Sequence, residues 1–329
     1  MNQAKMGKFI KELREEKGLT QKDIGDKLNI TDNSVSKWER GINAPDIYTL
    51  GPLSEILGVS VKELLNGEKN NRKKKKNVDD LPNILEVNNL SKIFDNKQIL
   101  NKVNMNIKEG EIVGLIGPNG AGKTTFIKSI LNLYKIDGGT VKICDKDIHT
   151  DLEFCLSKVG CIIENPDFYP YLSGRKNIQI IKLMNNINDD EYVEQTIKLL
   201  KLSTRINDKV KKYSLGMKQR LGIACALIKK PRLLILDEPT NGLDPLGIKE
   251  LRELVKDIST KLKTSVLISS HILSEIENIC DKIYIIDNGY IIDELDVSEM
   301  KSHDLSLEQA YLNITSGSKG QIGGELWKI

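Results

Sequence analysis

A glycine-rich segment with a single lysine lies just beyond the first third of the 329-residue chain. It spans residues 117–125 and stands between an apolar run and a helical pattern. Glycines at this spacing let backbone N–H groups turn toward phosphate oxygens, while the lysine and the next hydroxyl reach the terminal phosphates and Mg²⁺. The segment predicts a nucleoside triphosphate site with Thr124 as a metal ligand, formed by Gly117, Pro118, Asn119, Gly120, Ala121, Gly122, Lys123, Thr124 and Thr125.

Two consecutive carboxylates follow a second apolar run, 233–236. If that run is a buried strand, Asp237 and Glu238 lie at the sheet edge where bound phosphates would sit. Asp237 is then expected to hold Mg²⁺, and Glu238 to act as the general base that polarises water. His271 follows a further apolar run and is predicted to sense the γ-phosphate. The alternative for each residue alone is a structural role. Asp237 and Glu238 could simply begin a turn, and a lone histidine such as His271 is more often structural.

The elements that must position these residues are strands and helices in alternation. The runs 111–117, 232–237 and 264–270 are apolar on both faces and are separated by helical patterns. This arrangement is typical of an α/β unit with a mostly parallel, buried sheet. The segment 175–210 is helical and polar on one side, and we expect it to form an inserted helical subdomain.

Three motifs in this unit resemble those of ABC ATPases, over about residues 84–317. The segments 237–240, 241–244 and 213–220 are similar to the Walker B, D-loop and signature motifs. The resemblance implies a P-loop NTPase that binds and hydrolyses ATP with Mg²⁺, as a head-to-tail homodimer with two sandwiched ATP molecules. It also implies further ATP contacts, namely Ser214 and Gly216 from the facing subunit, Asp244, and Phe94 stacked on adenine. The alternative for Phe94 is an ordinary strand aromatic.

The chain departs from the usual family pattern at two places. The signature keeps its serine and one glycine, and Glu164 stands where glutamine is usual. The glutamate is similar to that of ATPases from bacitracin and lantibiotic resistance exporters. By this resemblance Glu164 senses Mg²⁺ or the attacking water, and it couples the site to a permease helix docked near Tyr169 and Tyr171. The alternative is that the glutamate at position 164 arose by evolutionary drift and has no such role.

No run of residues approaches the ~18 to 20 apolar positions that a membrane-spanning helix needs. A transporter subunit of this kind therefore requires a separate membrane permease. We expect the chain to lie in the cytoplasm, at the inner face of the cell membrane when it is bound to that permease. The five cysteines are odd in number and include no C-x-x-C pair, which favours reduced thiols packed in a core.

The N-terminal residues form short helical patterns joined by tight polar turns. The segment 19–41 resembles the helix-turn-helix of Cro-like repressors, the xenobiotic-response-element family. One face of the two helices carries apolar residues that we expect in the core: Ile24, Leu28, Val35 and Trp38. By resemblance, the contacts to double-stranded DNA are made by Gln21, Asp32, Asn33, Ser36 and Lys37, with Gln21 on a phosphate and Asn33, Ser36 and Lys37 at base edges.

The charge of this N-terminal segment is balanced, because residues 1–66 contain ten Lys and Arg against ten Asp and Glu. Since net positive charge supplies non-specific affinity for DNA, one copy is expected to bind weakly. The basic run 72–76 beyond it could assist, or it could be a solvated charge run. A helical bundle kept for protein contacts is the alternative to DNA binding.

The predicted organisation is a small all-α helix-turn-helix domain (1–66), a basic linker (67–83), an α/β ABC ATPase domain with a helical subdomain (84–317) and a tail (318–329). The predicted function is the ATP-hydrolysing subunit of an exporter for peptide antibiotics or similar compounds, with a sequence-specific DNA-binding domain. The alternative is a soluble transcriptional regulator switched by ATP. The sequence does not identify the transported compound, the permease or the operator.

Overall fold

The computed structural model describes residues 3–59, 61–67, 81–164, 166–302 and 306–317. The chain divides into two compact units, Met1–Asp80 and Leu81–Ile329, which are described separately below. Most of the predicted linker and all of the predicted tail lie outside the described residues. The four domain boundaries given above therefore remain predictions.

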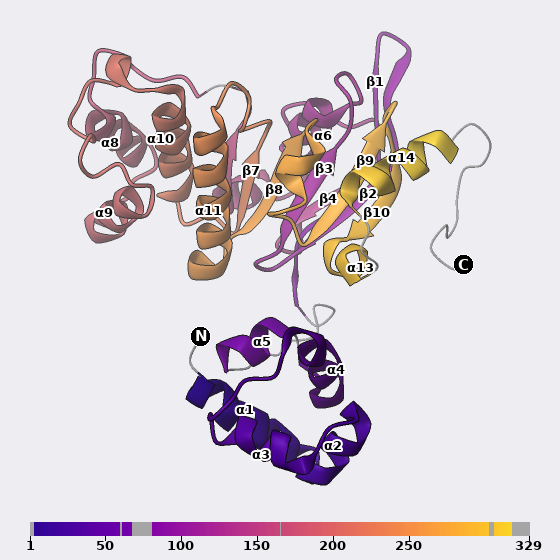
Figure 1. Ribbon diagram of the computed structural model, residues 1–329. Coiled ribbons are helices and arrows are strands. Elements are labelled where there is room, and N and C mark those ends of the chain that lie inside the picture. Colours follow the sequence, from indigo (N-terminus) through magenta and orange to yellow (C-terminus); the bar gives the residue numbers. More distant parts are fainter. Residues whose placement is uncertain (1–2, 60, 68–80, 165, 303–305, 318–329) are drawn as a thin grey trace. The chain divides into compact units, whose positions relative to one another are not determined.

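The N-terminal unit is a bundle of short helices (Figure 1), which the structure gives as α1 (Gln3–Glu16), α2 (Gln21–Leu28), α3 (Asp32–Glu39), α4 (Ile47–Leu57) and α5 (Val61–Asn66). Thr20 begins α2 with a capping box. Its side chain accepts a hydrogen bond from the backbone N–H of Asp23, and the Asp23 carboxylate accepts one from the backbone N–H of Thr20. Asn29 ends α2 in the left-handed conformation, and Thr31 caps α3. The predicted helix-turn-helix is confirmed.

Two glycines let the helices of this bundle approach closely. A Cβ atom on Gly7 of α1 would lie 2.1 Å from the carbonyl oxygen of Trp38, and one on Gly25 of α2 would lie 2.9 Å from that of Ile30. The bundle core is made of ten buried side chains: Met6, Phe9, Ile10, Leu13, Ile24, Val35, Trp38, Leu53, Leu57 and Leu64. Leu28, which was also expected in the core, packs against it while staying half-buried.

The second unit is built on a six-stranded sheet in the order β10-β9-β3-β8-β7-β6. Its strands are β3 (Ile112–Ile116), β6 (Val159–Ile162), β7 (Leu233–Leu236), β8 (Ser265–Ser270), β9 (Lys282–Asp287) and β10 (Tyr290–Asp296). All neighbours are parallel except β9 and β10, which form an antiparallel pair. The three predicted strand runs are β3, β7 and β8, so the expected α/β sheet is confirmed.

Alternate residues of β7 enter different cores. Leu233 and Ile235 belong to one buried cluster, and Leu234 and Leu236 belong to the other. Because the strand is covered on both faces, every position of it is apolar, and the run is visible in the sequence without alternation. The carboxylates that follow it emerge from a fully packed sheet.

A second, four-stranded antiparallel sheet was not predicted. Its order is β2-β1-β4-β5, from β1 (Asn83–Phe94), β2 (Lys97–Lys108), β4 (Gly138–Ile143) and β5 (Lys146–Asp147). The pairing of β1 with β2 shifts register several times, and Asn89 and Lys102 adopt positive φ within these strands. Such irregularities break the alternation of apolar and polar residues that identifies a strand in sequence.

Helices complete the second unit: α6 (Lys123–Ile130), α7 (Leu152–Ser157), α8 (Gly174–Met184), α9 (Asp190–Leu199), α10 (Leu215–Leu227), α11 (Pro245–Leu262), α12 (Leu273–Ile276), α13 (Val297–Ser302) and α14 (Leu307–Gly317). In Figure 1, α8, α9 and α10 gather at one end of the unit, apart from α6 and the antiparallel sheet. We call α8, α9 and α10 the helical lobe. The inserted helical subdomain expected at 175–210 corresponds to α8 and α9.

None of the helices in the described ranges is both long and apolar enough to cross a membrane. All five cysteines are described and free, and Cys155 and Cys280 are buried as expected. The expectation is wrong for Cys161, which is exposed. Cys161 lies on β6, the last strand of the sheet, and lines a cavity beside that strand.

Candidate functional site

The glycine-rich segment forms a tight loop between β3 and α6. A Cβ atom on Gly117 would lie 2.1 Å from the carbonyl oxygen of Ile286 in β9, so only glycine fits there. Gly120 and Gly122 adopt φ values of 81° and 110°, which L side chains rarely adopt. The loop therefore carries its backbone N–H groups around the start of α6, where the helix dipole favours negative charge.

Lys123, at the first position of α6, is turned back over this loop. Its buried ammonium donates to the carbonyl oxygens of Gly117 at 2.8 Å and Pro118 at 3.2 Å. It also forms an ion pair with Glu238, with 3.1 Å between Nζ and Oε1. A buried cation thus stands where the terminal phosphates of a nucleotide in the loop would lie.

Asp237 is buried at the end of β7 and is held through both carboxylate oxygens. Thr124 donates its hydroxyl to Oδ2 at 2.8 Å. Ser269, on the neighbouring strand β8, donates to Oδ1 at 2.5 Å. Two of the three residues predicted at the metal, Thr124 and Asp237, are therefore in contact in the fold.

Glu238 accepts three side-chain interactions. Besides Lys123, these come from the amide of Asn241 at 2.6 Å and from Nδ1 of His271 at 3.1 Å, both on Oε2. Burial opposes ionisation of this carboxyl, but the hydrogen bonds from Asn241 and Lys123 and the charge of Lys123 outweigh it and lower the pKa of Glu238. The predicted base and the predicted γ-phosphate sensor are thus in contact, with the base ionised.

Glu164 lies on the segment that follows β6 and is exposed. Its carboxylate accepts a hydrogen bond from Lys128 of α6 at 3.2 Å, and this bond raises the pKa of Lys128. Its backbone has a φ of 61°, in the left-handed region that non-glycine residues seldom occupy. This backbone geometry carries the carboxylate from the edge strand toward the helix that begins with the phosphate loop.

The oxygen donors around Asp237 fit Mg²⁺. This cation prefers hard oxygen ligands and is usually held by one or two protein groups together with phosphates and waters. The Thr124 hydroxyl, the Asp237 carboxylate and the exposed Glu164 carboxylate are of this kind. Among the described residues, no cluster of three or more His, Cys, Asp or Glu could hold a metal ion.

Phe94 ends β1 as a partly exposed aromatic. Its ring meets Tyr134 edge to face at 5.1 Å between centroids, and the ammonium of Lys92 lies 4.7 Å from its centroid. Sequence analysis singled out Phe94 but missed Tyr134, which follows α6 without any motif to mark it. An adenine contact by Phe94 remains a prediction.

The signature segment begins α10, and the D-loop begins α11. Ser214 caps α10 by accepting from the N–H of Met217 at 3.2 Å, and Asp244 caps α11 by accepting from that of Gly247 at 2.8 Å. A Cβ atom on Gly242 would lie 2.9 Å from the side chain of Leu215, so the two motifs adjoin. Ser214 and Asp244 are exposed.

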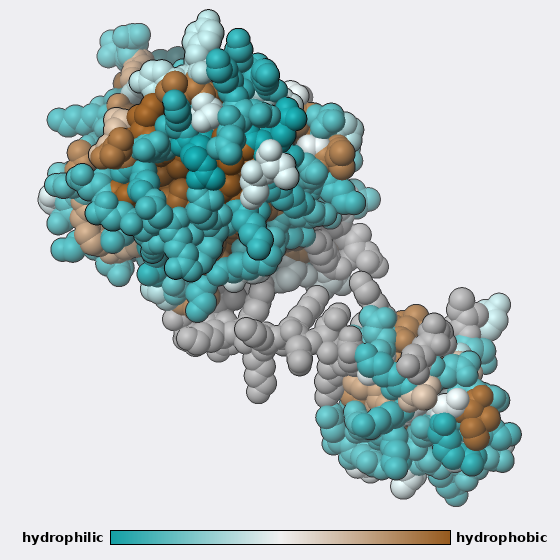
Figure 2. Space-filling model, turned by 90° about the vertical axis from the view of Figure 1, so that its left-hand side faces the viewer, coloured by the Kyte–Doolittle hydropathy of each residue, from teal (hydrophilic) through white to brown (hydrophobic). Residues whose placement is uncertain are grey.

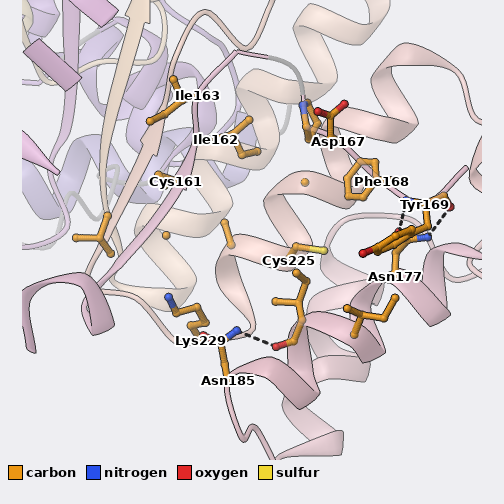
Figure 3. Close-up of a pocket in the computed structure, with 17 residues that line it drawn as sticks. Cys161, Ile162, Ile163, Asp167, Phe168, Tyr169, Asn177, Asn185, Cys225 and Lys229 are labelled. Atoms are coloured by element: carbon orange, nitrogen blue, oxygen red, sulfur yellow. Dashed lines mark hydrogen bonds between the residues drawn. The ribbon is translucent and has the colours of Figure 1, made fainter. Parts of the chain in front are cut away.

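A cavity of about 430 Å³ is lined by residues of β6, α8 and α10 and by the segment 166–169. Figure 3 shows Phe168, Tyr169 and Cys225 facing it, with Tyr169 fixed by two hydrogen bonds to Asn177. Burial raises the pKa of the Cys225 thiol to about 12, so the thiol stays neutral and lines the cavity as an apolar group. Figure 2 shows apolar surface gathered on the side of the unit where the helical lobe lies.

In the N-terminal unit, the residues predicted to contact DNA lie on α3 and at the start of α2. Asp32, Asn33 and Lys37 are exposed, and Ser36 is half-buried. Gln21 differs from expectation, since its amide donates to Glu39 at 2.7 Å, and Glu39 is in turn paired with Arg14 at 2.6 Å. A phosphate contact by Gln21 must use its second N–H, because one is already bonded.

The chain matches two family models. The ABC transporter model matches residues 100–241, and the helix-turn-helix model matches residues 10–64. The uncharacterized ABC transporter ATP-binding protein YdbJ of Bacillus subtilis is 43% identical over 72% of this chain and 76% of its own length. The chain belongs to the ABC transporter ATP-binding protein family. Its N-terminal unit is a helix-turn-helix DNA-binding domain.

Other ABC relatives have assigned functions. The bacitracin transport ATP-binding protein BcrA of Enterococcus faecalis is 42% identical, over 67% of this chain and 72% of its own. The lantibiotic transport ATP-binding protein SrtF of Streptococcus pyogenes is 44% identical, over 64% of this chain and 89% of its own. An ATP-binding cassette solved as a dimer in a post-hydrolysis state with ADP and Pi is 25% identical, with a TM-score of 0.56, over 65% of this chain and 98% of its own.

Three side chains that bond directly to the predicted carboxylates of the ATP site were missed by sequence analysis. Asn241 lies in the D-loop motif, but nothing in that motif connects its side chain to Glu238. Lys128 and Ser269 lie outside every motif. They belong to a helix and a strand that the sequence analysis recognised only by their apolar patterns. Only the fold brings these side chains to the ABC ATPase site.

Gly117→Ala should abolish nucleotide binding, because the added Cβ would lie 2.1 Å from a backbone carbonyl and must distort the phosphate loop. Titration of the purified protein with a fluorescent ATP analogue measures the effect. Gly120→Ala is the matched control, since no atom lies within 4 Å of its added Cβ. It should weaken binding only through its positive φ. Equal affinity of Gly117→Ala and wild type would contradict the close packing of the loop.

Proposed function

We propose that this chain hydrolyses ATP as the Mg²⁺-dependent motor subunit of an exporter. The observation that carries the proposal is the convergence of Lys123, Thr124, Asp237, Glu238 and His271 at one end of the parallel sheet. Phosphate-binding, metal-binding and proton-accepting groups are there within hydrogen-bond distance of one another. Relatives that transport bacitracin and lantibiotics support the same function.

In the proposed reaction, the loop N–H groups and Lys123 bind the β- and γ-phosphates of ATP. The γ-phosphate competes with Glu238 for Lys123, and the carboxylate is then free to accept a proton from the attacking water. His271, already beside Glu238, donates to the γ-phosphate. Thr124, Asp237 and Glu164 would hold Mg²⁺, which neutralises charge on the phosphates when it is bound.

Glu238→Gln should keep ATP binding and lower hydrolysis by about 10²- to 10⁴-fold, the usual contribution of a general base. Phosphate release by the purified protein, together with ATP titration, measures both effects. Glu253→Gln on α11 is the control, because that exposed carboxylate pairs only with the surface residue Lys201 in the described structure. Hydrolysis by Glu238→Gln at the wild-type rate would exclude Glu238 as the base.

The active form is proposed to be a head-to-tail homodimer. Ser214, Gly216 and Asp244 adjoin one another, and the serine and aspartate are exposed. Such a surface is available to close over an ATP held by the phosphate loop of a second copy. A relative of similar fold solved as a dimer with ADP and Pi supports this assembly.

The cavity beside β6 is proposed as the docking site for a separate permease, which would place the chain at the inner face of the cell membrane. Most of its lining residues are apolar. Tyr169, at 60% exposure, is one of them, and Tyr171, at 73% exposure, lies two residues further along the chain. Glu164 lies in the chain between the lining segments 159–163 and 166–169, so a docked helix would act on the segment that carries a residue of the ATP site. Peptide antibiotics are the proposed class of transported compound.

Ile180→Glu should prevent membrane recovery, because it puts a charge into the apolar lining of the cavity. Tagged chain is co-expressed with its permease and membranes are sedimented. Leu133→Glu is the control, since Leu133 is 62% exposed and does not line the cavity. Retention of Ile180→Glu at the membrane at the wild-type level would exclude this cavity as the docking site.

The helix-turn-helix domain is proposed to read an operator through Asn33, Ser36 and Lys37. Asn33→Ala should lower operator affinity roughly 5- to 150-fold, by the ~1–3 kcal/mol of a base contact. A gel shift measures this, with the exposed Lys8→Ala on α1 as the control. Unchanged binding by Asn33→Ala would exclude this face. A shift that depends on added ATP would favour the alternative, an ATP-switched regulator.

A further inference from the structure

One buried hydroxyl bonds to both carboxylate residues of the ATP site. Ser269 is 0% exposed in β8, next to the end of β7. Its Oγ accepts the backbone N–H of Glu238 at 2.8 Å and donates to Oδ1 of Asp237 at 2.5 Å. The same oxygen atom therefore bonds to Asp237, the predicted metal ligand, and to Glu238, the predicted base. We call these the metal-side and base-side carboxylates.

The first of these bonds fixes the orientation of Asp237. Its Oδ2 receives the Thr124 hydroxyl at 2.8 Å, while Oδ1 receives Ser269. With both oxygens held, the carboxylate plane cannot rotate freely. Because Thr124 belongs to the phosphate-loop helix and Ser269 to β8, Asp237 is fixed between two elements that are distant in sequence.

The second bond fixes the backbone of Glu238. This residue has a φ of 46°, in the left-handed region where a non-glycine residue persists only when its surroundings hold it. Ser269 supplies an acceptor for its N–H in that conformation. The side chain then leaves the end of β7 toward Lys123 and His271, at 3.1 Å from each.

We propose that Ser269 is a positioning residue that sets the metal-side and base-side carboxylates relative to each other. The proposal rests on the hydrolytic function proposed above and deepens it. Ser269 is buried, and in the described structure its side-chain hydroxyl bonds only to these two residues, so it acts through them. Alanine can neither accept nor donate, cysteine does both weakly, and threonine keeps the hydroxyl.

The same strand offers a matched control in Ser265, which is also 0% exposed. Its hydroxyl accepts the N–H of Gly110 at 2.9 Å and donates to the carbonyl oxygen of Lys108 at 3.0 Å. Ser265→Ala therefore also removes one accepted and one donated hydrogen bond. Ser265 lies at the opposite end of β8 from Asp237 and Glu238. Loss of stability alone should follow from Ser265→Ala.

The test uses the full chain carrying Ser269→Ala, Ser269→Cys, Ser269→Thr or Ser265→Ala. Thermal melting is recorded first, and then kcat and KM for ATP. ATP affinity is measured by calorimetry with Mg²⁺ and with EDTA, and the ratio of the two affinities reports the contribution of the metal. This ratio does not depend on turnover.

For Ser269→Ala we expect kcat and the Mg²⁺-dependent affinity ratio each to fall roughly 10- to 100-fold, as for other partners of metal ligands. The affinity in EDTA should stay within about twofold, because the phosphate loop is intact. KM for ATP in the presence of Mg²⁺ should rise together with the loss of Mg²⁺-dependent affinity. Ser269→Thr should recover most of both losses and Ser269→Cys less. Ser265→Ala should melt earlier but keep the wild-type ratio and kcat.

The proposal is overturned if Ser269→Ala keeps the wild-type ratio and kcat, or if Ser265→Ala lowers them equally. If Ser269→Ala is unfolded, Ser269→Cys and Ser269→Thr are compared instead. Equal kcat and equal affinity ratios for these two variants overturn the proposal. Absence of hydrolysis in the wild type would count against the proposed function alone. The affinity ratio would still test whether Ser269 positions Asp237.

Discussion

The nucleotide site depends on the contact between a buried cation and the carboxylate that follows β7. Lys123 and Glu238 lie 3.1 Å apart, on elements separated by more than a hundred residues of sequence. Lys123 is buried, and an unpaired buried charge is strongly unfavourable, so the Glu238 carboxylate stabilises it. The pair therefore keeps the start of α6 beside the end of β7, and the remaining site residues are arranged around it.

The parallel sheet makes this contact possible. Strands β3, β8 and β7 are neighbours in the order of the sheet, so the phosphate loop, Ser269 and the two carboxylates all leave the same edge. Both faces of β7 are covered, which fixes the level at which Asp237 and Glu238 emerge. Fully buried strands thus fix the positions at which the site residues leave the sheet.

The two ends of this chain perform different kinds of recognition. The larger unit combines a nucleotide site with an apolar cavity, and Glu164 stands between them in the sequence. The smaller unit holds its recognition helix by a nearly buried ion pair, Arg14 with Glu39, to which Gln21 is bonded. Because that network is internal, the exposed face of α3 remains available for a ligand.

By itself the sequence determined the features that depend on local spacing. Residues 117–125 indicate a phosphate loop because glycine positions and one lysine are enough to define it. Residues 19–41 indicate a helix-turn-helix because two short helical patterns, each with an apolar face, are joined by only a few residues. The irregular antiparallel sheet, the cavity, and the bonds of Ser269 and Asn241 to the carboxylates were not predictable. These depend on which residues the parallel sheet and its coverings bring together across long stretches of chain, and no local pattern records such proximity. Only the tertiary structure decided them.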